Sequence, residues 1–279
     1  MTVRVEGYSI TASLEPPHPR STISDPVFDA RELATGARVA LKVLHLGFPL
    51  RASTSENFLE LINRARKIDS PFAVKCLASG FTEDDHAPWF TMQPVGAPSL
   101  ASAIHRGARC TPAQTRKILT EAVHASTAAY AQGLEESLSL RHLSITSEGE
   151  ARCWNFGVGA WRVASQAVVA GTYTAAGQIR WGTEITPDAL NGKAPTRADA
   201  VVSLALISFA LLSGRHYWNA DQSPDAAAME LMMEVMAGPH EAPSVRAGEV
   251  TLPNGYDEWF SVCVNGDFAD APTAIGQLP

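Results

Sequence analysis

The first part of the chain alternates short apolar runs with polar turns, which is typical of a sheet. Runs rich in β-branched and apolar residues predict strands at 27–30, 38–44, 73–78 and 89–92. Between the first two, Thr35-Gly36 favours a turn. At 57–68, apolar residues recur every three or four positions, which predicts one amphipathic helix. This part is therefore expected to be mostly sheet with a single helix.

Beyond Pro98 the pattern changes, and longer segments with helical periodicity replace the short apolar runs. Thr111, Pro112 and Gln114 form a helix start, with a capping residue, a proline in the first turn and a glutamine three residues after the cap. Helices are expected at 111–132, 197–214, 223–237 and 256–264, with Ser223 and Pro224 starting the third. A small β-rich part thus precedes a larger helical part, and the fold class is α+β.

Composition and charge narrow the function classes. Hydrophobic residues make up 46% and charged residues 18%, so the chain can bury a sizeable core. The net charge of −7 argues against binding a phosphate backbone, so we expect no nucleic-acid partner.

The cysteines and the apolar runs indicate where the protein works. No C-x-x-C pair occurs, and the four cysteines are far apart, which favours reduced thiols: Cys76, Cys110, Cys153 and Cys263. The longest apolar stretch, 200–212, is shorter than the roughly 20 residues that span a membrane. The first residues do not resemble a signal peptide. We therefore expect a cytoplasmic protein without a membrane partner.

Several short motifs follow one another along the chain. VALKVL (39–44) carries Lys42 on a predicted strand; WFTMQPVGAPSL (89–100), WNFGV (154–158), ITPDAL (185–190), the long helix at 196–215 and LPNGYDEWF (252–260) come after it. In this order and spacing, the chain resembles the eukaryotic-like Ser/Thr protein kinases of bacteria over essentially its whole length. The resemblance implies a single two-lobed domain covering 1–279. Its N-lobe would span about 1–93, its hinge about 93–98 and its C-lobe about 99–279.

The same resemblance shows which catalytic parts are missing. Where the family has a glycine-rich loop, residues 15–26 contain four prolines and no glycine. Ser137 occupies the position of the catalytic Asp, and His142 occupies that of the metal-binding Asn. Asn155 stands where the D-F-G motif has its Asp, a neutral oxygen where Mg²⁺ prefers a carboxylate. We expect no catalytic residue, no metal site and no ordinary phosphoryl transfer.

Lys42 also loses its usual acidic partner in this alignment. The helix position that carries a glutamate in the family is Leu61, with Glu60 one residue away. A shift of one residue turns a helical side chain by about 100°. Asn155 remains as a weak partner for Lys42.

Parts of a nucleotide pocket are retained. The resemblance places Val27 and Ala40 above an adenine, Met92 as gatekeeper, and the carbonyl of Gln93 and the N–H of Val95 as hinge groups. Ser144 would form the floor. These positions are also ordinary core positions, so no cofactor is expected; ATP or ADP, if bound, would be held without Mg²⁺ by these residues with Lys42 and Asn155.

Three functions remain open. The first is a pseudokinase that binds, scaffolds or allosterically regulates another protein, with the segment 155–188, including Tyr173, Thr174 and Trp181, as one contact surface. The second is a nucleotide-binding switch. The third is an enzyme with residual phosphoryl or nucleotidyl transfer, for which Asp25, Glu60 and Glu135 are the nearby carboxylates.

Overall fold

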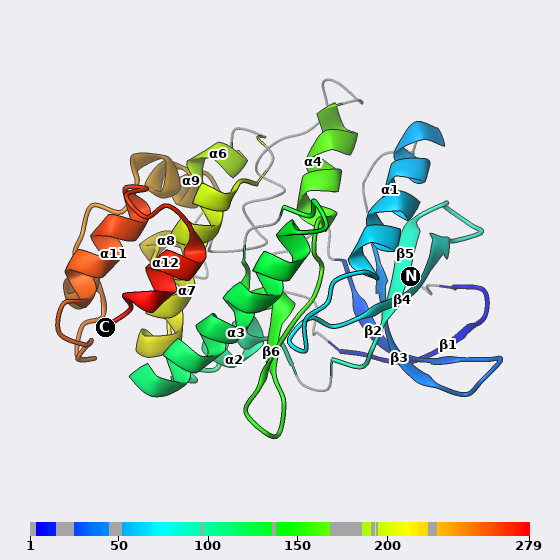
Figure 1. Cartoon of the computed structure of the whole chain (residues 1–279), viewed down its shortest axis with the longest axis horizontal. Coiled ribbons are helices and arrows are strands. Elements are labelled where there is room, and N and C mark those ends of the chain that lie inside the picture. Colours follow the sequence, from blue (N-terminus) through cyan, green and yellow to red (C-terminus); the bar gives the residue numbers. More distant parts are fainter. Residues whose placement is uncertain are drawn as a thin grey trace.

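A five-stranded antiparallel sheet lies at one end of the molecule, and helices make up most of the rest (Figure 1). The computed structural model describes residues 4–14, 25–44, 52–95, 98–135, 138–167, 186–190, 193, 195–222 and 228–279. The sheet has the order β1-β2-β3-β5-β4. Its strands are β1 (Tyr8–Ser13), β2 (Val27–Glu32), β3 (Arg38–Val43), β4 (Cys76–Phe81) and β5 (Pro88–Met92). The chain is thus a mixed α+β protein, as the pattern predicts.

Strand β3 is central, and all its residues except Arg38 are buried. This explains its nearly continuous apolar sequence, because a strand covered on both faces shows no alternation. Helix α1 (Ala52–Ala65) contacts strands β4 and β5 and buries Phe58, Leu61 and Ile62 at helical spacing. The helix predicted at 57–68 is therefore present, but it begins and ends earlier in the sequence than predicted.

Two strand predictions need correction. The strand expected at 73–78 begins at Cys76 and extends to Phe81, three residues beyond its predicted end. Strand β1 was not predicted, because its side chains are half-buried or exposed and give only a weak apolar signal. It pairs with β2 through a register shift between Ile10 and Ala12.

The remaining helices follow the five sheet strands in the sequence. They are α2 (Leu100–His105), α3 (Pro112–Tyr130), α4 (Val158–Ala167), α6 (Pro187–Leu190), α7 (Arg197–Ser213), α8 (Asn219–Gln222), α9 (Ala228–Ala237), α10 (Pro243–Arg246), α11 (Tyr256–Val264) and α12 (Ala271–Gly276). Helix α7 is buried along nearly all of its length and contacts α3, α11 and α12. A helix that is apolar all round is expected in such a central position.

Helix ends follow the sequence signals closely. Thr111 and Gln114 form the predicted capping box at the start of α3. Thr196 and Asp199 form a second box at α7, and Gly214 ends that helix at a φ of +76°. The predicted start of the third helix at Ser223 and Pro224 lies outside the described residues. Helix α12 was not predicted; Asp270 caps it by accepting from the Thr273 N–H at 2.8 Å.

No helix in the described ranges is long and apolar enough to cross a membrane.

Candidate functional site

Lys42 is the buried cation of the site. It lies near the end of β3 and is 4% exposed. Its Nζ donates to Oδ1 of Asn155 at 2.6 Å, and it lies 3.4 Å from Nε2 of His142. The structure therefore brings together three residues that the sequence singled out, although 100 or more residues separate Lys42 from the other two.

Asn155 holds its place through an unusual backbone conformation. Its φ is +77°, in the left-handed region where asparagine is one of the few tolerated residues. Gly157 has the same φ, and a Cβ on it would come within 2.9 Å of Leu134 and 3.2 Å of Leu61. This turn aims the amide oxygen of Asn155 at Lys42. Because that oxygen is neutral, it solvates the ammonium without neutralising it.

His142 ends the short 3₁₀ helix η1 (Leu140–His142), just before strand β6 (Leu143–Ile145). Burial, followed by the charges of Lys42, Arg141 and Arg162, holds the pKa of His142 well below its ordinary value. The ring is thus neutral near pH 7, and Nε2 can accept from Lys42 when Nδ1 carries the proton. Ser137, predicted at the catalytic Asp position, lies outside the described residues.

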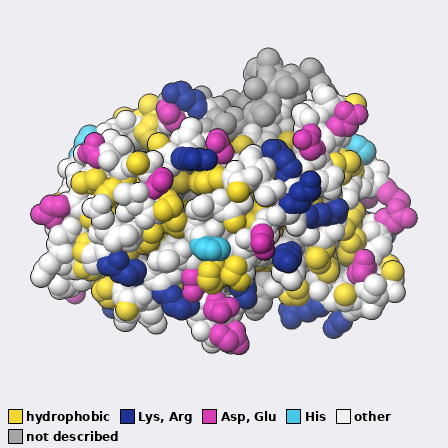
Figure 2. All heavy atoms as spheres, in the orientation of Figure 1, with side chains coloured by type: hydrophobic (Ala, Val, Ile, Leu, Met, Phe, Trp, Pro, Cys, Tyr) yellow, Lys and Arg dark blue, Asp and Glu magenta, His cyan; other side chains and the backbone are white. Residues whose placement is uncertain are grey.

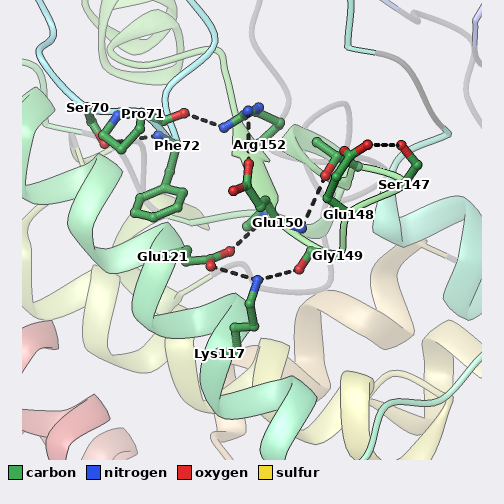
Figure 3. Close-up of polar contacts among 12 residues, drawn as sticks. Ser70, Pro71, Phe72, Lys117, Glu121, Ser147, Glu148, Gly149, Glu150 and Arg152 are labelled. Carbon is green, nitrogen blue, oxygen red and sulfur yellow. Dashed lines mark hydrogen bonds and ion pairs between the residues drawn. The ribbon is translucent and has the colours of Figure 1, made fainter.

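The hairpin of β6 and β7 (Ala151–Cys153) positions both polar partners of Lys42, since His142 precedes one strand and Asn155 follows the other. Figure 3 shows how this hairpin is tied to its surroundings. Glu121 of α3 accepts from the Ala151 N–H at 2.7 Å, and Lys117 donates to the Gly149 carbonyl at 2.5 Å. Arg152 donates to the Pro71 carbonyl.

The backbone ties the same hairpin to the segment before β4. The Val74 N–H donates to the Cys153 carbonyl, and the Cys153 N–H donates to the Phe72 carbonyl, each at 2.8 Å. The hairpin that carries His142 and Asn155 is therefore bonded on one side to this segment and on the other to α3.

The acidic residues considered for catalysis are either exposed or paired with another cation. Glu60 and Glu135 are exposed, and Leu61 packs beside Gly157 where the alignment expects a glutamate. Asp25 pairs with Arg162 at 2.6 Å. Within the part of the chain that the structure describes, no group of three His, Cys, Asp or Glu residues could hold a metal ion.

The predicted adenine positions lie mostly in the apolar core. Buried side chains occupy four of them, namely Val27, Ala40, Met92 and Val95. Gln93 is exposed, and its N–H donates to the Lys75 carbonyl at 3.0 Å. The buried Ser144 hydroxyl donates to the Val95 carbonyl at 3.2 Å, which ties the proposed floor to the proposed hinge. A small pocket of about 10 Å³ is lined by His142 together with Leu138, Trp154 and Phe156 among others.

Helix α4 begins immediately after the Asn155 turn and lies beside α1 (Figure 1). Its Trp161 donates from Nε1 to the Thr54 carbonyl at 3.2 Å, and its ring lies 5.1 Å from that of Phe58. This helix within 155–188 was not predicted from the sequence. Its buried residues nevertheless recur at helical spacing, namely Val158, Trp161 and Ser165. Tyr173, Thr174 and Trp181 lie outside the described residues.

No family model matches the chain. A protein named as a probable serine/threonine-protein kinase in Corynebacterium efficiens is 24% identical over 218 residues, which cover 77% of this chain and 32% of the relative. The chain thus spans about a third of the length of this curated relative. The similarity is weak, and it suggests a kinase-like domain.

Proposed function

We propose that the chain forms a two-lobed protein-kinase-like domain that does not transfer phosphate and instead binds, scaffolds or allosterically regulates another protein. The observation that carries the proposal is the hydrogen bond from Lys42 to the neutral amide of Asn155. The second polar group near the Lys42 ammonium, the ring of His142, is neutral as well. In the proposed alignment, carboxylate and amide ligands of Mg²⁺ are replaced by groups that suit Mg²⁺ poorly.

The loss of the base reinforces this interpretation. Phosphoryl transfer depends on a positioned base and on metal ions that bridge the phosphates. A serine at position 137 cannot accept a proton near neutral pH, and the loss of a base costs on the order of 10²–10⁴ in rate.

A transfer assay with radiolabelled ATP tests the proposal. The purified chain is incubated with Mg²⁺ or Mn²⁺ and a general acceptor such as casein, alongside Lys42→Ala and the exposed control Lys75→Ala. We expect equal background labelling in all three samples. Labelling that Lys42→Ala removes and Lys75→Ala retains would contradict the proposal.

Exposed apolar side chains support a protein as partner. Met229, Met233 and Met236 lie on one face of α9 and are 61%, 66% and 48% exposed. Figure 2 shows further hydrophobic side chains between interspersed positive and negative ones on the face in view. We propose that this partner is met in the cytoplasm.

A nucleotide-binding switch is a second candidate, favoured by the position of Lys42 directly opposite Val27 in the sheet. A thermal-shift titration with ATP and ADP, with and without Mg²⁺, tests it on the wild type and on Lys42→Ala. Binding at a hundred times Kd adds about 2.7 kcal/mol, which moves the melting temperature by several degrees. A shift lost in Lys42→Ala supports the switch, and a flat titration leaves the scaffold. Nothing in the described residues favours the unusual enzyme.

A further inference from the structure

The small pocket against His142 has the size and the lining of a site for one water molecule. Its volume is about 10 Å³, and four of its lining side chains carry a hydroxyl oxygen or a ring nitrogen, namely Ser126, Ser139, His142 and Trp154. A buried water needs roughly 10–15 Å³ and about two to four polar partners. Both requirements are met here, and the pocket is too small for an organic ligand.

Trp154 brings a donor that needs an acceptor. Its side chain is 4% exposed, and its Nε1 is buried without a hydrogen-bond partner among the described residues. An indole N–H can only donate, and a buried donor without an acceptor is destabilising. The Trp154 backbone N–H donates to the His142 carbonyl at 3.1 Å, and the two rings meet edge to face with their centroids 6.3 Å apart. Both rings are therefore held at the same pocket.

His142 supplies a second donor. Its Nε2 lies 3.4 Å from the Lys42 Nζ. Because an ammonium can only donate, Nε2 has to accept, and the proton of the neutral ring is then on Nδ1. This Nδ1 proton needs an acceptor in its turn. The pocket also contains two hydroxyl groups that can accept from a water molecule, those of Ser126 on α3 and of Ser139 at the start of η1.

We propose that the pocket binds one water molecule that fixes the tautomer of His142 for Lys42. The water accepts from Nδ1 of His142 and from Nε1 of Trp154, and it donates to the two serine hydroxyls of the pocket. Without it the ring proton can move to Nε2, where it would face the Lys42 ammonium as a second donor. Ser126 and Trp154 are thus positioning residues that act on Lys42 through His142. This inference is independent of the proposed function.

Nuclear magnetic resonance on the whole chain tests this site. Magnetisation transfer from water to the indole N–H protons identifies a tryptophan beside a long-lived bound water, and the nitrogen shifts of the His142 ring report its tautomer. Trp89 is the internal control, because its Nε1 is also buried without a partner among the described residues but it does not line the pocket. We expect transfer to Trp154 and not to Trp89, with the His142 proton on Nδ1.

Filling the pocket should remove both signals. Ser126→Val replaces the hydroxyl and adds a methyl group, so the water signal at Trp154 should disappear and His142 should lose its single Nδ1–H tautomer. Ser126→Ala, a second variant should the first not fold, should weaken both signals. Ser165→Ala is the matched control, because Ser165 is a buried helix serine that does not line the pocket.

Ser165→Ala should keep both signals. A wild type without water transfer at Trp154, equal transfer at Trp89 and Trp154, or a His142 proton on Nε2 would overturn the proposal. Signals that stay unchanged in the folded Ser126 variants would overturn it as well.

Discussion

The sheet side and the helical side of the molecule differ in what their buried polar groups do. Around α7, Asp199 accepts from Thr186 at 2.5 Å and from the Thr196 N–H at 2.8 Å, so its carboxylate begins a helix. On the sheet side, Lys42 is buried against Asn155 and His142, and none of the three begins or ends a helix through its side chain. On the helical side, the buried carboxylate thus helps to define where a helix begins. On the sheet side, the buried ammonium instead joins strand β3 to the two ends of the hairpin of β6 and β7.

The largest expected effect lies on the helical side. Phe209, at the centre of α7, is fully buried, and Phe209→Ala should lower the free energy of unfolding by about 3–5 kcal/mol because it leaves a cavity. Urea denaturation measures the loss. Leu33→Ala, at a residue 68% exposed, is the control and should change little. An equal loss in both variants would show that burial around α7 does not carry the stability.

The next effect concerns α4 and should remain local. Trp161→Ala removes the ring packed on Phe58 and the bond to Thr54, which should weaken protection of the α4 amides by roughly 2–3 kcal/mol. Hydrogen exchange should show faster exchange in α4 and unchanged exchange in α7. Trp161→Phe keeps the packing and loses the hydrogen bond, so it should have a smaller effect. Equal acceleration in α7 would contradict the separation of the two sides.

A pH dependence of stability should arise from His142. Since the pKa of His142 is lowered in the folded protein, the unfolded chain binds more protons below its ordinary pKa of about 6.5, and stability falls as pH falls. Between pH 7.5 and pH 5.5 this group should therefore lower the free energy of unfolding as the pH falls.

Urea unfolding of His142→Asn should lack this part of the pH dependence. His240→Asn, at an exposed histidine, should retain it. Parallel pH profiles for wild type and His142→Asn would refute the assignment.

The smallest effect is expected at the exposed face of α9. Met233→Ser should change the free energy of unfolding by no more than about 0.5 kcal/mol, because the Met233 side chain is mostly exposed in the folded protein. Thermal unfolding measures it. A larger loss would mean that this face is packed in solution.

The helical side was the more predictable from sequence, for a local reason. Capping boxes place their signals within three residues, so the starts of α3 and α7 are encoded at Thr111 and Thr196. The bond between Lys42 and Asn155 spans 113 residues, and alignment with a family suggested it only as a weak partnership. The ion pair of Arg162 with Asp25 spans 137 residues and has no local pattern at all. Helix α4 could have been found from its periodicity, whereas its position against α1 could not.

The hairpin that carries the site also makes it sensitive to its surroundings. Its exposed turn at Ser147 and Glu148 lies at the opposite end from His142 and Asn155. Side chains outside the site hold this hairpin in place, namely Lys117, Glu121 and Arg152. Because the two strands connect these contacts to His142 and Asn155, substitutions at the three anchoring residues should shift both side chains relative to Lys42.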